Sequence, residues 1–333
     1  MDANDAVSIE RWSSPAFLEE ARDWVRHACR DQGIELADGS VQPHCRPWSS
    51  AVRFETSEGP LGFKVNGPGT LHGATLVATL GDLVPDLVPA VLALDADRGW
   101  SWTRDAGPVM RSIASPDQLW APWEGVLVRY AVAQIDLGNQ VPALLETGVH
   151  EVSPTTLPDH ALRLVKELGD LDPDTGGLSV QSADALDERL SAYSDWCAEL
   201  AASGIPNSIQ HDDLHSNNIC WGGDVEDARI IDWGDASVGH PLGTMLCTLN
   251  SIAHHAGCEI DEPRVARTRD AYLEPFTTFA ERSDLVRYVA LARRTGCVAR
   301  ALSYKAALHG EPVATHAELD FPVRGWLLEM LED

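Results

Sequence analysis

The sequence predicts an α+β protein of two lobes, a small strand-rich N-lobe followed by a larger helical C-lobe. Strand patterns and turn residues dominate roughly the first third of the 333 residues, and helical patterns dominate the remainder. A hydrophobic content of 44% over this length is enough for a substantial core. We place the boundary so that residues 1–105 form the N-lobe and residues 106–333 the C-lobe.

The first predicted element is a helix over residues 14–33. Ser14 suits its N-cap, Pro15 suits its first turn, and Gly33 lies beyond its end. Between these residues, apolar side chains recur at helical spacing. The pattern therefore predicts one helix ahead of the first strands.

Strands follow this helix. The segments "SVQPHCR", "AVRFET" and "LGFKV", separated by "PWSS" and "SEGP", predict an antiparallel meander. The segment "TLHGATLVATL" then predicts a helix, and "VPAVLAL" and "WSWTRD" predict two strands on either side of the turn "DADRG". The N-lobe is therefore expected to hold an antiparallel sheet.

Helical patterns fill the C-lobe. The predicted helices are 118–135, 157–168, 184–203, 242–256, 263–279 and 284–309. Short strands interrupt them at "SIQ", and at "ICW" and "ARIIDW" around the turn "GGDVED".

The charge balance excludes some classes of partner. Acidic residues number 51 and basic residues 25, which gives a net charge of −26 and disfavours nucleic-acid binding. This acidity is compatible with a cationic substrate and equally with a solubility trait spread over the surface. Seven scattered cysteines without a CxxC pair support neither a disulfide framework nor a zinc site. With no signal-like N-terminus and no apolar run of about 18 residues, we expect a cytoplasmic protein that does not bind membranes.

A polar cluster, "QHDDLHSNNICW", covers residues 210–221 between two short predicted strands. A loop held between fixed ends can place side chains accurately. Asp213 and Asn218 are five residues apart, and Asp232 follows 19 residues after Asp213 (232 − 213) at the end of "RIID". A carboxylate and a carboxamide make an all-oxygen pair that suits Mg²⁺. Asp213 remains free to accept a proton from a hydroxyl group.

Two other interpretations of the cluster stay open at this point. A zinc site would use His211, His215 and an aspartate, but the HxxxH spacing suits metal ligation only when both side chains share a helical face. The flanking strands and the adjacent asparagines argue against a helix here. The second alternative is a polar loop in which His211 is simply a hydrogen-bonded core residue.

Together, "HDDLHSNNI" and "IDWGDASVGHPLGTM" resemble the motif pair of the aminoglycoside phosphotransferase-like kinases, over roughly residues 40–328. The resemblance implies a protein-kinase-like fold. It implies that Asp213 is the base for the substrate hydroxyl, that His211 braces the loop, and that Asn218 and Asp232 bind Mg²⁺. It also implies that Lys64, one of only three lysines, contacts the α/β-phosphates of the nucleotide.

The sequence departs from the pattern of protein kinases between the first two strands. Where those proteins have a glycine-rich loop, this chain has "RPWSSAV". Backbone N–H groups, with Ser49 and Ser50, are the candidates to hold phosphate oxygens. Ordinary turn chemistry is the alternative for both serines.

A second departure concerns the partner of Lys64. The family usually pairs this lysine with a glutamate on the next helix, but "GPGTLHGATLVATLGD" contains none, and Gly73 or a neighbour takes that place. Asp82 is the first acid after Lys64. Lys64 therefore pairs with Asp82, with Asp232, or with neither until nucleotide binds.

The remaining candidates come from the linker between the lobes and from acidic residues near the polar cluster. The segment "WSWTRDAG" matches the linker between lobes, where the backbone of Thr103, Arg104 and Asp105 would meet the adenine edge. Asp212 and Asp235 are candidate substrate-facing acids, with loop hydrogen bonding as the alternative for each.

The resulting hypothesis is an ATP-dependent phosphotransferase that uses Mg²⁺ and a small-molecule hydroxyl acceptor, with GTP as the alternative donor. An aminoglycoside-like compound, an amino sugar or another metabolite fits the acceptor role equally well. The competing classes are a nucleotide-binding pseudokinase and a zinc-dependent hydrolase. Oligomeric state does not follow from the sequence.

Overall fold

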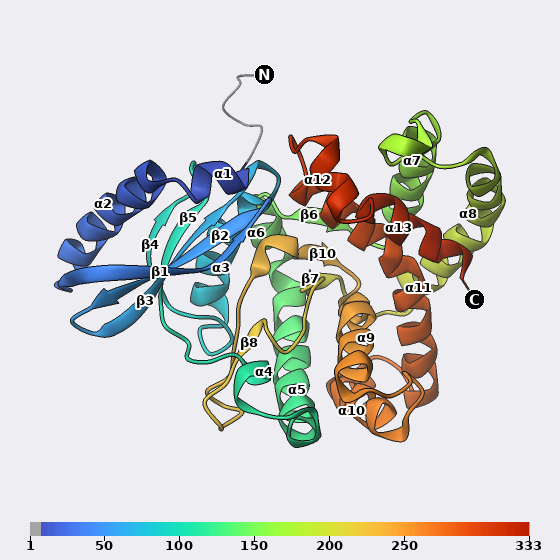
Figure 1. Cartoon of the computed structure of the whole chain (residues 1–333). Helices are drawn as coiled ribbons and strands as arrows, with labels where there is room; N and C mark the ends of the chain where they lie inside the picture. The colour runs from blue at the N-terminus through green and yellow to red at the C-terminus, as the bar shows by residue number, and fades with distance from the viewer. Residues whose placement is uncertain (1–7, 333) are drawn as a thin grey trace.

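The structure, a computed structural model, describes residues 8–332 and has the two predicted parts (Figure 1). In this view the sheet-containing N-terminal part, blue to cyan, lies beside the helical C-terminal part, green to red. The fold class expected from the sequence is therefore confirmed.

The N-terminal sheet has the strand order β1-β2-β3-β5-β4, and every neighbouring pair is antiparallel. Its strands are β1 (Leu36–Arg46), β2 (Ser49–Thr56), β3 (Gly59–Asn66), β4 (Val91–Asp95) and β5 (Trp100–Arg104). The first three form the predicted meander. Lys64 on β3 lies opposite Ala51 on one side and Ser101 on the other, in the middle of the sheet.

Helix α2 (Pro15–Gln32) precedes the sheet and has both predicted caps. The side chain of Ser14 accepts a hydrogen bond from the backbone N–H of Phe17 at 3.2 Å. Gly33 ends the helix with φ of 71°, in the left-handed region that glycine adopts without steric cost. The prediction of this helix is confirmed at both ends.

Helix α2 covers one face of the sheet. Phe17 packs edge-on against Trp100 of β5, with ring centroids 5.8 Å apart. Phe63 and Val65 of β3 belong to the same buried cluster. Because side chains alternate between the two faces of a strand, Lys64 points to the face opposite α2. That face is where a ligand between the two parts would lie.

Helix α3 (His72–Leu83) follows the short 3₁₀ helix η1 (Pro68–Thr70) and links the two parts. Its side chains Leu76 and Leu80 are fully buried. They belong to the core cluster of the helical part, together with Leu127 and Tyr130. Although α3 lies between strands of the sheet in the sequence, its packing anchors it to the C-terminal part.

The long helices predicted for the C-terminal part are all present. They are α5 (Trp120–Leu137), α7 (Leu157–Gly169), α8 (Val180–Ala201), α9 (Met245–Ala256), α10 (Pro263–Leu273) and α11 (Arg282–Ala307). The predicted helix 263–279 is divided, because a 3₁₀ segment, η7 (Glu274–Thr278), follows α10. Helix α11 contributes buried residues to two core clusters and so joins them.

The sequence pattern does not predict the shorter helices, since four to seven residues are too few to show a helical period. These are α1 (Ser8–Trp12), α4 (Met110–Ile113), α6 (Val141–Glu146), α12 (Val313–Glu318) and α13 (Pro322–Leu328). The other 3₁₀ segments are η2 (Pro116–Gln118), η3 (Gly138–Gln140), η4 (Pro173–Thr175), η5 (Trp233–Asp235), η6 (Pro241–Thr244) and η8 (Glu329–Leu331).

Two small sheets lie where the parts meet. In the first, β10 (Ser237–Gly239) pairs in parallel with β6 (His150–Val152) and antiparallel with β7 (Ser208–Gln210). In the second, β8 (Ile219–Cys220) pairs with β9 (Arg229–Ile230) around the predicted turn. The strand patterns predict β7, β8 and β9, but not β6 and β10. Together the two sheets fix both ends of the polar loop 211–218.

All seven cysteines are free thiols. None of the helices within residues 8–332 combines the length and the apolar character that spanning a bilayer requires.

Candidate active site between the two parts

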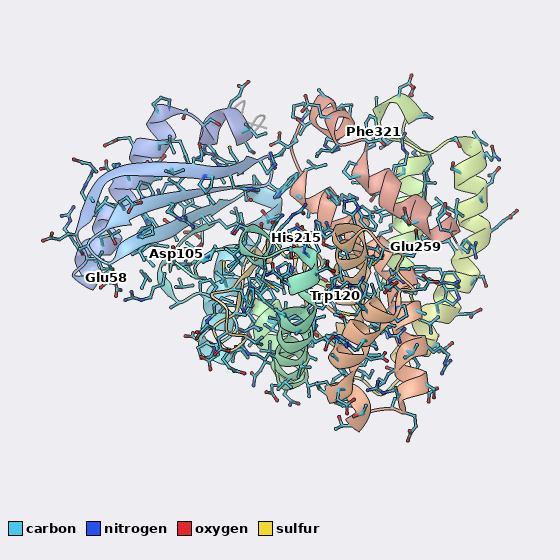
Figure 2. The ribbon with its side chains drawn as sticks, turned by 60° about the horizontal axis from the view of Figure 1, so that its bottom comes forward. Glu58, Asp105, Trp120, His215, Glu259 and Phe321 are labelled. Atoms are coloured by element: carbon cyan, nitrogen blue, oxygen red, sulfur yellow. The ribbon has the colours of Figure 1, made fainter. Side chains whose placement is uncertain are left out.

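The polar loop 211–218 runs from the end of β7 to the start of β8. Figure 2 labels one of its side chains, His215, near the middle of the molecule, with Glu58 at the outer end of the sheet. The backbone N–H of His211 donates to the hydroxyl of Tyr130 on α5 at 2.8 Å. The loop is thus tied to the central helix at its first residue.

His211 is fully buried, and both of its ring nitrogens are occupied. Nε2 donates to the carbonyl oxygen of Ile231 at 2.9 Å, and Nδ1 accepts from the backbone N–H of Asp213 at 3.3 Å. The ring also packs against Trp233, with centroids 4.8 Å apart. Burial lowers the pKa of His211, so the ring is uncharged at neutral pH. His211 therefore has no free nitrogen with which to bind zinc.

A metal cage of protein nitrogen, sulfur and carboxylate ligands is not found elsewhere in the part of the chain that the structure describes. Residues 8–332 contain no group of three or more His, Cys, Asp and Glu side chains placed to hold a metal ion.

Asp213 has a nitrogen of a basic side chain beside each of its carboxylate oxygens. Nη2 of Arg300, on α11, lies 3.3 Å from Oδ1, and Nε2 of His215 lies 3.4 Å from Oδ2. Burial alone raises the pKa of Asp213, but the charge of Arg300, aided by His215, outweighs it and holds the pKa below its ordinary value. Asp213 is therefore ionised at neutral pH, and about a third of its side chain is exposed.

Asn218 is the last residue of this loop, and Asp232 follows strand β9, which pairs with β8 directly after the loop. Nδ2 of Asn218 donates to the carbonyl oxygen of Asp213 at 2.9 Å, which leaves the amide oxygen available as a ligand. Asp232 has φ of 65°, a left-handed conformation that costs a non-glycine residue free energy. It directly precedes η5, where the chain turns sharply. An amide oxygen and a carboxylate are hard donors of the kind that Mg²⁺ prefers.

Lys64 forms an ion pair with Oδ1 of Asp232. Burial raises the pKa of Asp232, but Lys64 outweighs it and lowers the pKa to about 2. Asp82, the other partner considered from the sequence, lies exposed on α3. Of the three alternatives for Lys64, the structure selects Asp232.

The close packing of α3 leaves no room for a glutamate side chain at the position of Gly73. A Cβ atom added to Gly73 would lie 3.0 Å from Cα of Gly234 and 3.1 Å from Nδ2 of Asn66. A longer side chain has no room there. Helix α3 therefore rests directly on the turn that carries Asp232.

Ser49 and Ser50 lie in strand β2, not in the turn before it. The turn is only two residues long, because β1 ends at Arg46 and β2 begins at Ser49. The hydroxyl of Ser50 donates to the carbonyl oxygen of His44 at 3.0 Å and accepts from Nε2 of Gln42 at 2.8 Å. Both serines are almost fully buried. The hydroxyl of Ser50 is thus used in hydrogen bonds within the sheet. Only backbone groups and Ser49 remain here as candidate phosphate contacts.

His44 belongs to the surroundings of the site, although no pattern in the sequence marks it. Its Nε2 lies 3.5 Å from the hydroxyl of Ser49. Burial lowers the pKa of His44, and the charge of Asp232 opposes this effect, which shows that the ring lies near the Lys64–Asp232 pair. A register shift between Val41 and His44 interrupts the alternation of β1, so the strand pattern does not reveal which way His44 points.

The linker segment begins inside the sheet. Thr103 and Arg104 pair with β3, and the backbone N–H of Arg104 donates to the carbonyl oxygen of Ala90 at 2.9 Å. The Arg104 side chain reaches Glu58 at 2.6 Å. Asp105 accepts from the backbone N–H of Gly107 at 3.1 Å. The backbone outside the sheet therefore starts at Asp105.

Of the two candidate substrate-facing acids, Asp212 is buried and directed toward strand β10. It is 5% exposed, and its Oδ2 accepts from the hydroxyl of Ser237 on β10 at 2.6 Å. Burial raises its pKa to about 7. Asp235 lies beside the loop and accepts from Nη1 of Arg300 at 3.1 Å. We therefore keep only Asp235 as an acid near the acceptor side.

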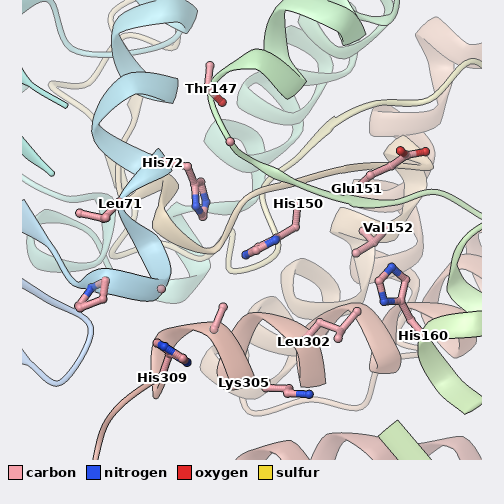
Figure 3. A pocket seen from close by; sticks show the side chains of 14 residues that line it. Leu71, His72, Thr147, His150, Glu151, Val152, His160, Leu302, Lys305 and His309 are labelled. Atoms are coloured by element: carbon pink, nitrogen blue, oxygen red, sulfur yellow. The ribbon is translucent and has the colours of Figure 1, made fainter. Parts of the chain in front are cut away.

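A cavity of about 640 Å³ lies on another side of α11 (Figure 3). Several imidazoles line it, including those of His72, His150, His160 and His309. Leu302 and Lys305 of α11 line the cavity, and His309 lies just beyond the end of this helix, whereas Arg300 contacts Asp213 and Asp235 from the opposite face of α11. The cavity and the predicted base are thus separated by the helix.

Comparisons with known proteins agree with the motif pair. The family model described as "Phosphotransferase enzyme family" matches residues 77–285. No curated protein matches the sequence.

Solved structures share the fold at low sequence identity. A macrolide 2′-phosphotransferase of type I has 16% identity and a TM-score of 0.56, over 92% of this chain and 97% of that chain. An ethanolamine kinase of Plasmodium vivax has 12% identity and a TM-score of 0.58, over 89% and 84%. A choline/ethanolamine kinase family protein from Mesorhizobium loti has 17% identity and a TM-score of 0.56, over 93% and 94%. These likenesses establish a fold shared with kinase-like phosphotransferases.

Proposed function

Because this chain belongs to the phosphotransferase enzyme family, and is thus a small-molecule phosphotransferase, we propose that it transfers the γ-phosphoryl group of ATP, bound with Mg²⁺, to a hydroxyl group of a small molecule. The observation that carries the proposal is the ionised Asp213, whose backbone carbonyl accepts from Asn218 and which lies, like Asp232, near His211, while Asp232 pairs with Lys64 of the N-terminal sheet. GTP is the alternative donor.

Phosphoryl transfer requires positioned groups and positive charge more than covalent chemistry from the protein. Lys64 donates hydrogen bonds to phosphate oxygens of the nucleotide, and Asp232 keeps its ammonium group in place. The oxygens of Asn218 and Asp232 would hold Mg²⁺, and the ion would neutralise charge on the phosphates. Their donor set fits this ion, because Mg²⁺ takes few protein ligands and keeps water and phosphate oxygens for the rest.

Asp213 accepts the proton of the acceptor hydroxyl. As the oxygen of that hydroxyl bonds to the γ-phosphorus, the bond from the γ-phosphorus to the bridging oxygen breaks and ADP leaves. The hydrogen bond from Asn218 to the Asp213 carbonyl and the brace from His211 hold the carboxylate steady during this step. Asp213 is well suited to this role because it is both ionised and partly exposed.

The nucleotide would lie under the face of the sheet opposite α2. Its phosphates would lie nearest to Ser49 and His44, whose side chains contact each other, and its adenine edge would meet the backbone from Asp105 to Ala106. Thr103 and Arg104 are less suitable, since the sheet uses their backbone groups.

The test is ATP consumption with Mg²⁺ against a library of hydroxyl compounds, which includes aminoglycosides, sugars and amino sugars, choline-like alcohols and macrolides. A thermal-shift titration with ATP and with GTP runs beside it. We expect turnover of at least one acceptor and stabilisation by the preferred nucleotide. ATP binding without turnover of any acceptor would support the pseudokinase alternative, and the absence of both would contradict the proposal.

A further inference from the structure

One arginine of α11 lies against the predicted base. Arg300 is 4% exposed, and its guanidinium reaches two carboxylates, with Nη2 at 3.3 Å from Asp213 and Nη1 at 3.1 Å from Asp235. Three residues later, the hydroxyl of Ser303 donates to the carbonyl oxygen of Asp235 at 3.1 Å. Helix α11 is thus docked onto this turn, and the guanidinium is fixed in place.

Two aromatic rings complete the surroundings of Arg300. The guanidinium carbon lies 4.9 Å from the ring centroid of Tyr304 and 5.8 Å from that of Trp326 on α13. Both distances are within the range of about 6 Å for cation–π attraction. Tyr304 also meets Trp48 of the β1–β2 turn, with centroids 6.4 Å apart. Two carboxylates and two rings form a binding site for a cation, and the cation that occupies it belongs to the chain itself.

This arrangement constrains the acceptor. Its hydroxyl must come within about 2.6–3.2 Å of Asp213 to transfer a proton. Substituents beside that hydroxyl then lie close to Arg300, whose charge does not titrate near neutral pH. A neighbouring ammonium group would meet a fixed like charge, and it would find Asp213 and Asp235 already paired.

We propose that Arg300 determines acceptor specificity by filling the cation site beside Asp213, so that the acceptor is an uncharged, sugar-like polyol without an ammonium group next to the reacting hydroxyl. This inference rests on the proposed function, since it takes Asp213 as the group that the hydroxyl approaches. The net charge of −26 then does not by itself indicate a cationic acceptor, because Asp213 and Asp235, the two carboxylates at this point of the site, are both paired with Arg300.

Binding of tetramethylammonium tests the inference without any need for turnover. Isothermal titration at constant ionic strength compares the wild type with Arg300→Met, Arg300→Lys and the control Arg294→Met. Arg294 is exposed on the same helix and stacks on Trp196, away from Asp213. Arg300→Met should bind the probe at least about 30-fold more tightly than the wild type. Arg300→Lys and Arg294→Met should behave like the wild type.

Equal binding by the wild type and Arg300→Met would overturn the inference, provided that the variant melts cooperatively. Cooperative melting is expected, because Asp213 and Asp235 are 31% and 20% exposed in their side chains and can be hydrated once the guanidinium is removed. If Arg300→Met does not fold, Arg300→Gln takes its place, since it retains a donor for the carboxylates.

Paired acceptors give a second measurement. The wild type should have a higher kcat/KM for an uncharged sugar than for the matching amino sugar, and Arg300→Met should reverse this order. A wild-type preference for the amino sugar would overturn the inference. If the wild type transfers phosphate to no acceptor, the proposed function fails, and the tetramethylammonium titration still decides whether Arg300 fills a cation site.

Discussion

Asp212, the residue before the predicted base, should destabilise the folded protein as the pH rises, and Asp212→Asn should remove this effect. Its side chain is 5% exposed and has the hydroxyl of Ser237 as a donor at 2.6 Å. Burial raises the pKa of Asp212 to about 7, and the charges of Asp235 and Asp213 add to this effect while Arg300 opposes it. An ionised Asp212 is therefore costly in the folded state.

The sign and size of the effect follow from the linkage between protonation and folding. When the pKa of a carboxyl group is higher in the folded state, its contribution to stability is fully present below the unfolded pKa and is lost as the pH rises through the folded pKa. For Asp212 these two pKa values are 3.8 and about 7. Each pKa unit corresponds to about 1.4 kcal/mol. Between pH 5 and pH 8, the wild type should thus lose about 2–3 kcal/mol of unfolding free energy through Asp212 alone.

Urea denaturation at pH 5 and pH 8 measures this loss. Asparagine has nearly the same shape and can accept from Ser237, so any cost of the exchange in hydrogen bonding is the same at both pH values. The difference between Asp212→Asn and the wild type should therefore shift by about 2–3 kcal/mol in favour of the variant from pH 5 to pH 8. Asp82→Asn, at an exposed position on α3, is the control and should show no such shift. A difference that is independent of pH, or that shifts in favour of the wild type, would refute the reasoning.

Three further predictions concern the site. Lys64→Met removes the partner of Asp232 and the predicted hydrogen-bond donor to the phosphates. In steady-state assays, kcat/KM for ATP should therefore fall by about 100-fold or more. A decrease of less than about threefold would contradict the role of Lys64 in binding the phosphates. Gly73→Ala places a methyl group 3.0 Å from Cα of Gly234 and should cost about 1–3 kcal/mol in urea denaturation, with reduced turnover. Gly81→Ala, on the same helix with nothing within 4 Å of the added atom, is its control and should be neutral or stabilising. Asn218→Ala should raise the Mg²⁺ concentration for half-maximal turnover by about tenfold or more, and an unchanged Mg²⁺ requirement would remove Asn218 from the metal site.

Local signals in the sequence were sufficient for much of the fold. Ser14 and Gly33 mark the ends of α2 because caps depend on backbone geometry within a few residues. The meander follows from alternation and turn residues, and its pleat alone directs Lys64 away from α2. The strands β6 and β10 are not marked by turn residues or alternation, and their pairing joins segments far apart in the chain.

The residues of the site likewise differ in whether a local pattern in the sequence marks them. Asp213, Asn218 and Asp232 carry a motif whose spacing is visible in one stretch of chain. Arg300 lies 87 positions from Asp213, and no local pattern marks it among the other arginines of α11. Lys64 and Asp232 are 168 positions apart, so their pairing is settled only by how the two parts pack. Close packing at Gly73 likewise becomes visible only when Gly234 lies beside it.

The most direct test of the proposed function is the turnover of Asp213→Asn on an acceptor found in the screen, measured together with its affinity for ATP. If Asp213 is the base, kcat should fall by about 100-fold or more, whereas the dissociation constant for ATP should stay within about twofold of the wild type. Turnover close to that of the wild type would contradict the assignment of Asp213 as the base.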